Sequence, residues 1–112
     1  MGMIHLLRAA ATDQQISEML EVHETYLKLA GDVQRGVVAG GGEFHADCES
    51  LLVEDGSRRE DIWGADWIPA EQAVRCSALI NIRPRLNPSL EIQEQAVRQR
   101  VEEIVRRVLK RR

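Results

Sequence analysis

Between Val37 and Arg83, apolar and polar residues alternate along much of the chain, and this two-residue period constrains the fold more than any other feature. Such alternation is typical of strands that bury one face of a sheet. Asp55-Gly56 lies between two alternating stretches, and this dipeptide is a strong signal for a two-residue hairpin turn. The sequence therefore predicts an antiparallel hairpin with Asp55-Gly56 at its tip.

The register of this hairpin sorts the side chains onto two faces. If the two turn residues form the tip, both tryptophans fall opposite apolar or small residues on the core side. The pairs predicted on that face are Phe44 with Trp67, Ala46 with Ala65, and Cys48 with Trp63. Nearer the turn, Leu51 and Val53 fall on the polar face, and a bulge near Ser50 would restore the alternation. We therefore expect both tryptophans and the single phenylalanine to be buried together.

The alternation resumes after Pro69, where residues 74–83 are predicted to form a third strand. The short link between the second and third strands favours an antiparallel meander. Residues 3–7 also fit a short strand, which would add a fourth. In this arrangement Cys48 and Cys76 lie too far apart for a disulfide, so both are predicted to be free thiols.

Two helices are expected on either side of these strands in the sequence. Thr12 and Gln15 form a capping box at the start of the first helix, and apolar residues at helical spacing continue past Gly31 to a predicted end at Gly36. Apolar residues between 97 and 108 recur at spacings of four and three, which predicts the second helix. The expected fold is α+β in a single domain, residues 1–112: a three-stranded antiparallel meander, with a fourth N-terminal strand left open, packed against two helices.

The charge distribution disfavours several classes of function. The net charge is −3, but residues 98–112 hold seven basic and two acidic residues, a balance of +5, so residues 1–97 carry −8. An acidic body disfavours nucleic-acid binding, which uses a basic face. No apolar run approaches the roughly 20 residues of a membrane span, and no basic region precedes the apolar N-terminal patch as it would in a signal peptide. We therefore predict a cytoplasmic protein that does not bind a membrane and for which nucleic acid is a disfavoured partner.

The second face of the predicted hairpin gathers ionisable side chains. Glu43, His45, Asp47 and Glu49 alternate along one strand, and the register places Asp66 opposite His45. Alternate residues of a strand lie about 6.6–6.8 Å apart and a cross-strand neighbour about 5 Å away. His45, Asp47 and Asp66 could therefore converge on one divalent cation. A solvated polar face without a ligand fits the same residues.

The edge of this face is expected to carry Asn81, Arg83 and Arg85, at the end of the third strand. Arginine suits bidentate binding of an anion, and loops at strand ends often carry function. Gly64, opposite Asp47 in the predicted register, would leave space for a water or a substrate. An anion site and ordinary ion pairs of Arg83 with nearby acids are both consistent with this arrangement.

Three segments, "AGGGEFHADCE", "EDGSRREDIWGADW" and "NIRPR", carry a likeness to a known group of proteins. With them the chain resembles a family of short uncharacterised bacterial proteins, frequent in cyanobacteria, over nearly its whole length from Met3. That family has no established activity or catalytic residues. The resemblance implies a bacterial, cytoplasmic protein and assigns no role to any residue.

Three functions are consistent with these features. The leading hypothesis is a protein that binds a partner protein or a small anionic ligand at the polar face and forms a homodimer. The homodimer is expected because the apolar stripe of the final helix is too short for a free-standing coiled coil and because the sheet has edges to cover. The second is a divalent-metal-dependent hydrolase or nuclease, with His45, Asp47 and Asp66 as ligands and Glu43 or Glu49 as general base. The third is a regulatory interaction module of the toxin–antitoxin type.

Overall fold

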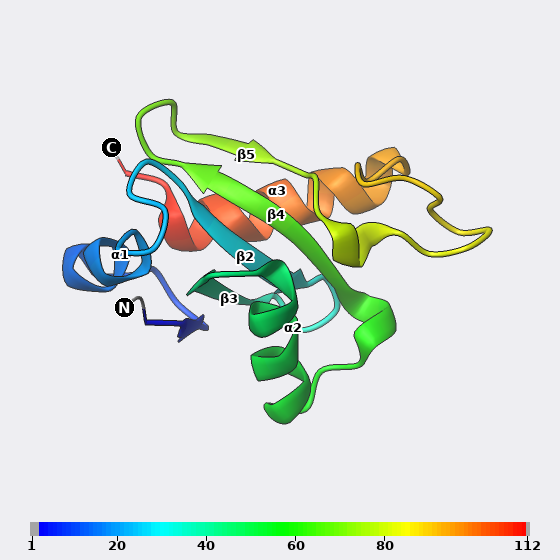
Figure 1. Ribbon diagram of the computed structural model, residues 1–112, viewed down its shortest axis with the longest axis horizontal. Coiled ribbons are helices and arrows are strands. Elements are labelled where there is room, and N and C mark those ends of the chain that lie inside the picture. Colours follow the sequence, from blue (N-terminus) through cyan, green and yellow to red (C-terminus); the bar gives the residue numbers. More distant parts are fainter. Residues whose placement is uncertain (1–2, 112) are drawn as a thin grey trace.

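The computed structural model describes residues 3–111 and contains one five-stranded antiparallel sheet, three α-helices and two short 3-10 helices (Figure 1). The elements in chain order are β1 (His5–Leu7), α1 (Asp13–Met19), β2 (Leu27–Asp32), β3 (Val37–Gly42), α2 (His45–Glu54), η1 (Arg59–Asp61), β4 (Ile62–Ile68), β5 (Ala73–Arg75), η2 (Leu79–Asn81) and α3 (Gln95–Leu109). The predicted α+β class is confirmed. The sheet has five strands rather than three or four.

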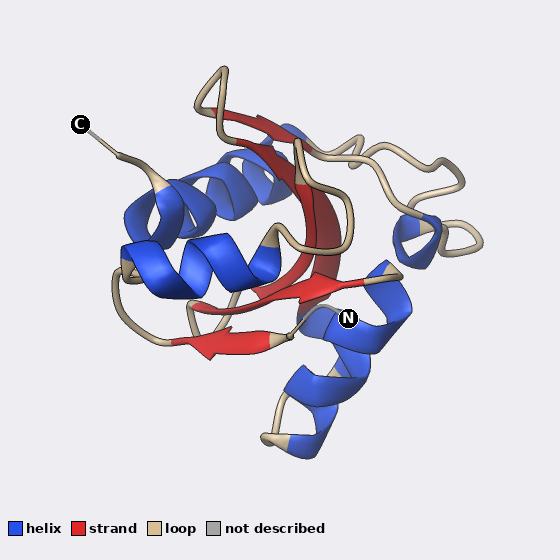
Figure 2. Cartoon of the chain, turned by 60° about the vertical axis from the view of Figure 1, so that its left-hand side comes forward, coloured by secondary structure: helices blue, strands red, loops and turns tan. Residues whose placement is uncertain are grey.

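The strand order is β1-β3-β2-β4-β5, so β2 and β4 lie near the centre although 29 residues separate their ends. Their six paired positions run from Leu27 opposite Trp67 to Asp32 opposite Ile62. Because side chains alternate along each strand, every second pair points to the same side of the sheet. Helix α3 covers one side and α2 the other (Figure 2).

The larger core lies between the sheet and α3, with α1 at its edge. Leu27, Leu29 and both tryptophans pack there, with Trp67 only 1% exposed. The residues that α3 contributes to this core are Val101, Ile104, Val105, Val108 and Leu109. The predicted final helix and the burial of both tryptophans are therefore confirmed. Since the apolar stripe of α3 packs on its own sheet, it needs no partner helix.

A smaller core lies between the sheet and α2. Its buried members are Ala30, Val37, Ala39, Cys48, Leu52 and Ile62. Most of these side chains are small, so α2 sits close to the strands. Only Cys48 and Leu52 of α2 are buried, which makes this a thin layer compared with the α3 side.

The first predicted helix begins correctly but ends much earlier than expected. Thr12 and Gln15 form the capping box, with both side chains accepting hydrogen bonds from backbone N–H groups. The helix ends at Met19 rather than Gly36, and residues 27–32 and 37–42 form a β-hairpin instead. Leu27 and Ala30 have helical spacing, but Leu27 and Leu29 share the α3 face of a strand.

The predicted hairpin with Asp55-Gly56 at its tip is wrong, because residues 45–54 form α2. Cys48, Leu51 and Leu52 have the spacing of one helix face, and all three contact the sheet-side core. The two residues expected at the turn instead end the helix: Asp55 is its C-cap, and Gly56 follows with a φ of 107°.

Phe44 is consequently not in the core. It is the N-cap residue of α2, and 58% of it is exposed, so its predicted burial with the tryptophans is wrong. The third predicted strand is also shorter than expected, since β5 ends at Arg75 and the chain continues through η2 and an extended loop. That loop, yellow in Figure 1, projects away from the sheet.

We predict that Gly41→Ala will lower the free energy of unfolding by about 2–5 kcal/mol. A Cβ at Gly41 would lie 2.5 Å from the Met3 carbonyl oxygen and 2.9 Å from the Met19 Cα, and the residue has a φ of 103°. A left-handed backbone costs roughly 1–2 kcal/mol for alanine, and overpacking adds about 1–3. Gly56→Ala is the matched control, since its φ is similar and nothing lies within 4 Å. Equal losses for the two variants in urea denaturation would contradict the close packing of β3 against α1.

We also predict that Asp55 makes stability depend on acidic pH. Hydrogen bonds from Arg35 and Arg8 hold the pKa of this carboxyl below its usual 3.8. A lowered folded-state pKa stabilises the protein above the unfolded-state pKa, and this stabilisation is lost as pH falls through the folded-state value. Asp55→Asn should therefore be less stable than the parent chain at pH 7, and the difference should shrink as the pH falls through the lowered folded-state pKa of Asp55. Glu54→Gln, at an exposed neighbour, should show no such difference, and thermal melts from pH 2 to 7 test both.

Candidate functional site

His45 and Asp66 meet in the structure, from α2 and β4 respectively. His45 Nε2 lies 2.8 Å from Asp66 Oδ1 and 3.1 Å from the Ala65 carbonyl oxygen. Both partners are acceptors, so Nε2 carries a proton and donates to them. Asp66 is buried, and its Oδ2 lies 3.5 Å from Arg75 Nη1. The pair is thus a fixed imidazole–carboxylate unit in which Nδ1 is the ring nitrogen open to a ligand.

The other three acids predicted for this face do not join the pair. Alternate residues of a helix do not share a face, so the change from strand to helix separates them. Asp47 accepts a hydrogen bond from the Phe44 N–H at 3.3 Å, and Glu49 pairs with Arg59 at 2.8 Å. Glu43 is exposed just before α2.

The proposed metal-ligand set is brought together only in part. His45 and Asp66 are in contact, whereas Asp47 caps the first turn of α2. Within residues 3–111, no three or more His, Cys, Asp or Glu side chains are grouped so that they could hold a metal ion. The described residues therefore supply two of the three predicted ligands at one place.

Asn81 has a structural position rather than a place at the edge of a ligand site. It is fully buried in η2, where Oδ1 accepts from the Gly64 N–H at 2.7 Å. Its Nδ2 donates to the carbonyl oxygens of Gly64 and Leu90, at 3.0 and 3.1 Å. These hydrogen bonds hold the loop after β5 against the centre of β4.

Arg83 also holds the loop in place. Its guanidinium lies 3.7 Å from the centre of the Trp63 ring and donates to the carbonyl oxygens of Glu60 and Ile62. Burial lowers the pKa of this guanidinium, and neighbouring acids partly offset the effect. Arg85 lies in the loop with a φ of 72° and is exposed. The expected anion site of these two arginines is therefore not assembled in this structure.

The space expected at Gly64 is filled by protein. A Cβ at this position would lie 2.6 Å from the Ala78 Cβ and 2.9 Å from the Ile80 Cγ1. The glycine allows the segment before η2 to approach β4 closely. It does not provide room for a water or a substrate.

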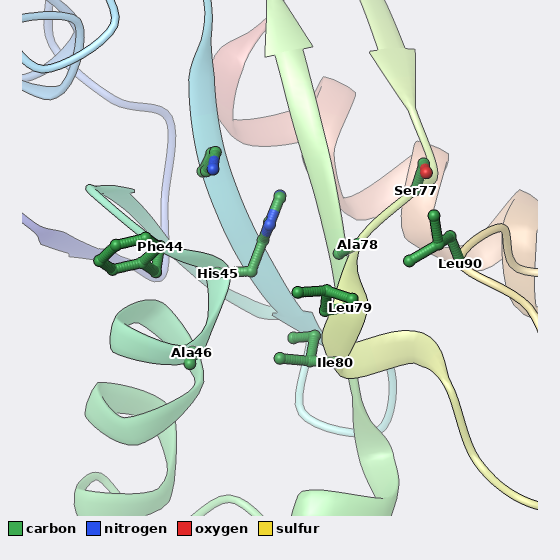
Figure 3. A pocket seen from close by; sticks show the side chains of 9 residues that line it. Phe44, His45, Ala46, Ser77, Ala78, Leu79, Ile80 and Leu90 are labelled. Atoms are coloured by element: carbon green, nitrogen blue, oxygen red, sulfur yellow. The ribbon is translucent and has the colours of Figure 1, made fainter.

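A cavity of about 350 Å³ lies beside His45, between α2 and the segment that leads into η2. We call it the α2–η2 cavity, and it is lined by Lys28, Phe44, His45, Ala46, Ser77, Ala78, Leu79, Ile80 and Leu90. Figure 3 shows His45 extending from the start of α2, with Ala78, Leu79 and Ile80 across from it and Leu90 farther away. The walls are mainly apolar, and the polar groups are few.

Lys28 is the residue that the sequence interpretation missed. It lies opposite Asp66 in the β2–β4 ladder, and its Nζ is 5.7 Å from the centre of the Phe44 ring. Its side chain forms no ion pair or hydrogen bond with any residue in 3–111. The alternation of Leu27 and Leu29 around it was the available signal, but this segment was interpreted as helix.

The rim of the cavity exposes several large apolar side chains. Of the six large apolar side chains that are exposed in the described part of the chain, three line the cavity: Phe44 at 58%, Leu79 at 76% and Leu90 at 44%. Two more, Ile82 and Leu86, lie in the adjoining loop. Clustered exposed apolar side chains are typical of binding surfaces.

The two cysteines are free, as predicted, and neither is a candidate nucleophile. Cys48 is buried and Cys76 is partly buried. Burial raises the pKa of each thiol to about 11, so both are protonated at neutral pH. The thiolate is the reactive form, so cysteine chemistry is disfavoured here.

Sequence comparison identifies the family of the chain. A family model described as "Protein of unknown function (DUF5674)" matches residues 5–108. The chain belongs to this family. The predicted membership of an uncharacterised family is therefore confirmed, and membership of DUF5674 assigns no activity to the His45–Asp66 pair.

One curated relative is a protein named "Lactate utilization protein B" from Anoxybacillus flavithermus, which is 32% identical over 82 residues. The match covers 73% of this chain but 15% of the relative. The shared segment is thus a small part of that longer protein. No solved structure matches the chain, and within residues 3–111 no helix has both the length and the apolar character needed to cross a membrane.

Proposed function

We propose that this DUF5674 protein binds a small amphiphilic organic anion, a carboxylate attached to a hydrocarbon group, in the α2–η2 cavity. The observation that carries the proposal is Lys28, a cation without an ion-pair partner in the described chain, at the edge of a mainly apolar cavity. A lysine side chain beside apolar walls is stabilised when an anion binds next to it.

The polar end of the ligand would meet two different groups. Lys28 offers N–H donors and positive charge to a carboxylate. His45 has its Nε2 committed to Asp66, so a neutral imidazole presents Nδ1 as an acceptor. A hydroxyl next to the carboxylate would satisfy that acceptor, which makes 2-hydroxy acids well-suited ligands.

The apolar end of the ligand would lie on the opposite wall. Leu79 and Leu90 line the cavity while remaining exposed, and Ile80 lines it beside them. Covering these side chains with a hydrocarbon group removes apolar surface from water, at about 25 cal/mol per Å². A ligand with a longer chain should therefore bind more tightly than one with a methyl group.

The curated relative supports the same ligand class. Its name refers to lactate utilization, and lactate is the smallest chiral 2-hydroxy carboxylate. Since the shared segment covers 15% of that protein, the name supplies a first probe and not an assignment. We expect lactate to bind weakly here because its methyl group covers little of the apolar wall.

The test is calorimetric titration with lactate, 2-hydroxybutanoate, 2-hydroxyhexanoate and 2-hydroxyoctanoate. Each added methylene should tighten binding by about fourfold, from roughly 0.8 kcal/mol per buried CH₂. Lys28→Met keeps the apolar stem and removes the charge, and it should weaken binding of every anion by about tenfold or more. Lys110→Met, at the chain's other lysine on the end of α3, is the matched control and should bind like the parent chain.

Two results would contradict the proposal. The first is 2-hydroxyhexanoate binding that Lys28→Met leaves unchanged. The second is equally tight binding of hexane-1,2-diol, which keeps the chain and a hydroxyl but lacks the carboxylate. A dependence on chain length without a dependence on charge would identify the cavity as a general apolar site instead.

The predicted homodimer and cytoplasmic location accompany this proposal. The free cysteines support a reducing compartment, and the exposed side chains of Leu79, Leu86 and Leu90 support association of some kind. The burial of the α3 stripe removes one of the two reasons for expecting a dimer, and the edge strands β1 and β5 remain as the other. The cavity rim is now the surface where association is expected.

A further inference from the structure

Asp32 lies on the face of the sheet that α2 covers, at the end far from the α2–η2 cavity. One of its carboxylate oxygens is buried without a hydrogen-bond partner among the described residues. Its Oδ1 accepts from the backbone N–H groups of Gln34 and Arg35 at 2.8 and 2.9 Å. Its Oδ2 is buried and accepts no hydrogen bond, and no other buried side-chain nitrogen or oxygen in residues 3–111 shares this condition. Buried polar atoms are nearly always paired, so this oxygen indicates a missing donor.

Asp32 lines a second cavity, of about 520 Å³, which we call the Asp32 cavity. Its lining residues are Asp32, Gln34, Arg35, Gly56, Arg58 and Asp61. It lies near the C-terminal end of α2, whereas the α2–η2 cavity lies at the N-terminal end. The two cavities share no lining residue.

The positive groups of this cavity are already engaged. Arg35 donates to Asp55 and to the Ser57 hydroxyl, both at 2.6 Å. Arg58 pairs with Glu60 at 2.9 Å. Within the described chain, the carboxylates of Asp32 and Asp61 form no ion pair. Asp32 Oδ2 is therefore an acceptor that the arginines of this cavity do not satisfy.

We infer that the Asp32 cavity binds a small organic cation through a primary ammonium group that donates to Asp32 Oδ2. An ammonium supplies both the missing N–H donor and the positive charge. A divalent metal ion fits less well, because divalent ions take several oxygen ligands and Asp32 offers one unpaired oxygen. This inference does not rest on the function proposed for the α2–η2 cavity, with which the Asp32 cavity shares no lining residue.

Titration with n-propylammonium chloride, followed by amide NMR spectra, tests the inference. The Gln34 and Arg35 amides bond to the other oxygen of the same carboxylate, so they should shift in a saturable manner. Sodium chloride at equal ionic strength should not shift them. Tetramethylammonium has the same charge without an N–H, and it should bind at least tenfold more weakly.

Asp32→Asn retains Oδ1 for the two amides and replaces the charged Oδ2 with an amide nitrogen. It should lose saturable binding of propylammonium, whereas Asp13→Asn, whose side chain is 97% exposed, should not. If Asp32→Asn does not fold, as judged by a poorly dispersed NMR spectrum, the inference is tested instead with Asp61→Asn and with the comparison of propylammonium and tetramethylammonium in the parent chain. Absence of saturable shifts in the parent chain, or equal affinity for both cations, would overturn the inference and leave an ordered water as the partner of Oδ2.

Discussion

The pairing of β2 with β4 is the interaction on which the rest of this structure depends. Its register sends Leu27, Leu29 and both tryptophans toward α3. The same register sends Lys28 and Asp66 to one end of the α2 face and Asp32 to the other. On the same face, α2 packs against Ala30 and Ile62, and the segment before η2 packs against Gly64. A one-residue slip would exchange the two faces, so the core and both cavities follow from a single alignment.

The sequence predicts the α3 side of this molecule well and the α2 side poorly, for a physical reason. Helix α3 has a long amphipathic period and β4 holds two tryptophans, so each has one structure compatible with its pattern. In contrast, α2 buries only Cys48 and Leu52, and its first residues alternate by coincidence. All six residues of β3 are buried, so that strand shows no alternation to detect.

The candidate site was predictable in part. The contact of His45 with Asp66 was expected, although it joins a helix to a strand rather than two strands. Lys28 could not be placed because its segment was assigned to a helix. The cavity wall could not be predicted either, because it is formed by a loop. Hydrogen bonds of buried side-chain amides determine the position of this loop. Asn81 bonds to both backbone groups of Gly64, and Asn87 donates to the carbonyl oxygens of Asn81, Ser89 and Glu91.

The thin layer beneath α2 has a consequence for how the two cavities would respond to their ligands. The N-terminus of α2 supplies His45 to one cavity, and the turn after its C-terminus supplies Gly56 to the other. Segments with few buried contacts open locally at a lower free energy than the whole protein unfolds. A ligand at either cavity would favour the docked helix and so reduce the cost of ordering it for the other ligand. Two chemically unrelated sites would then be linked by positive coupling, and each ligand would raise the affinity for the other by the same factor.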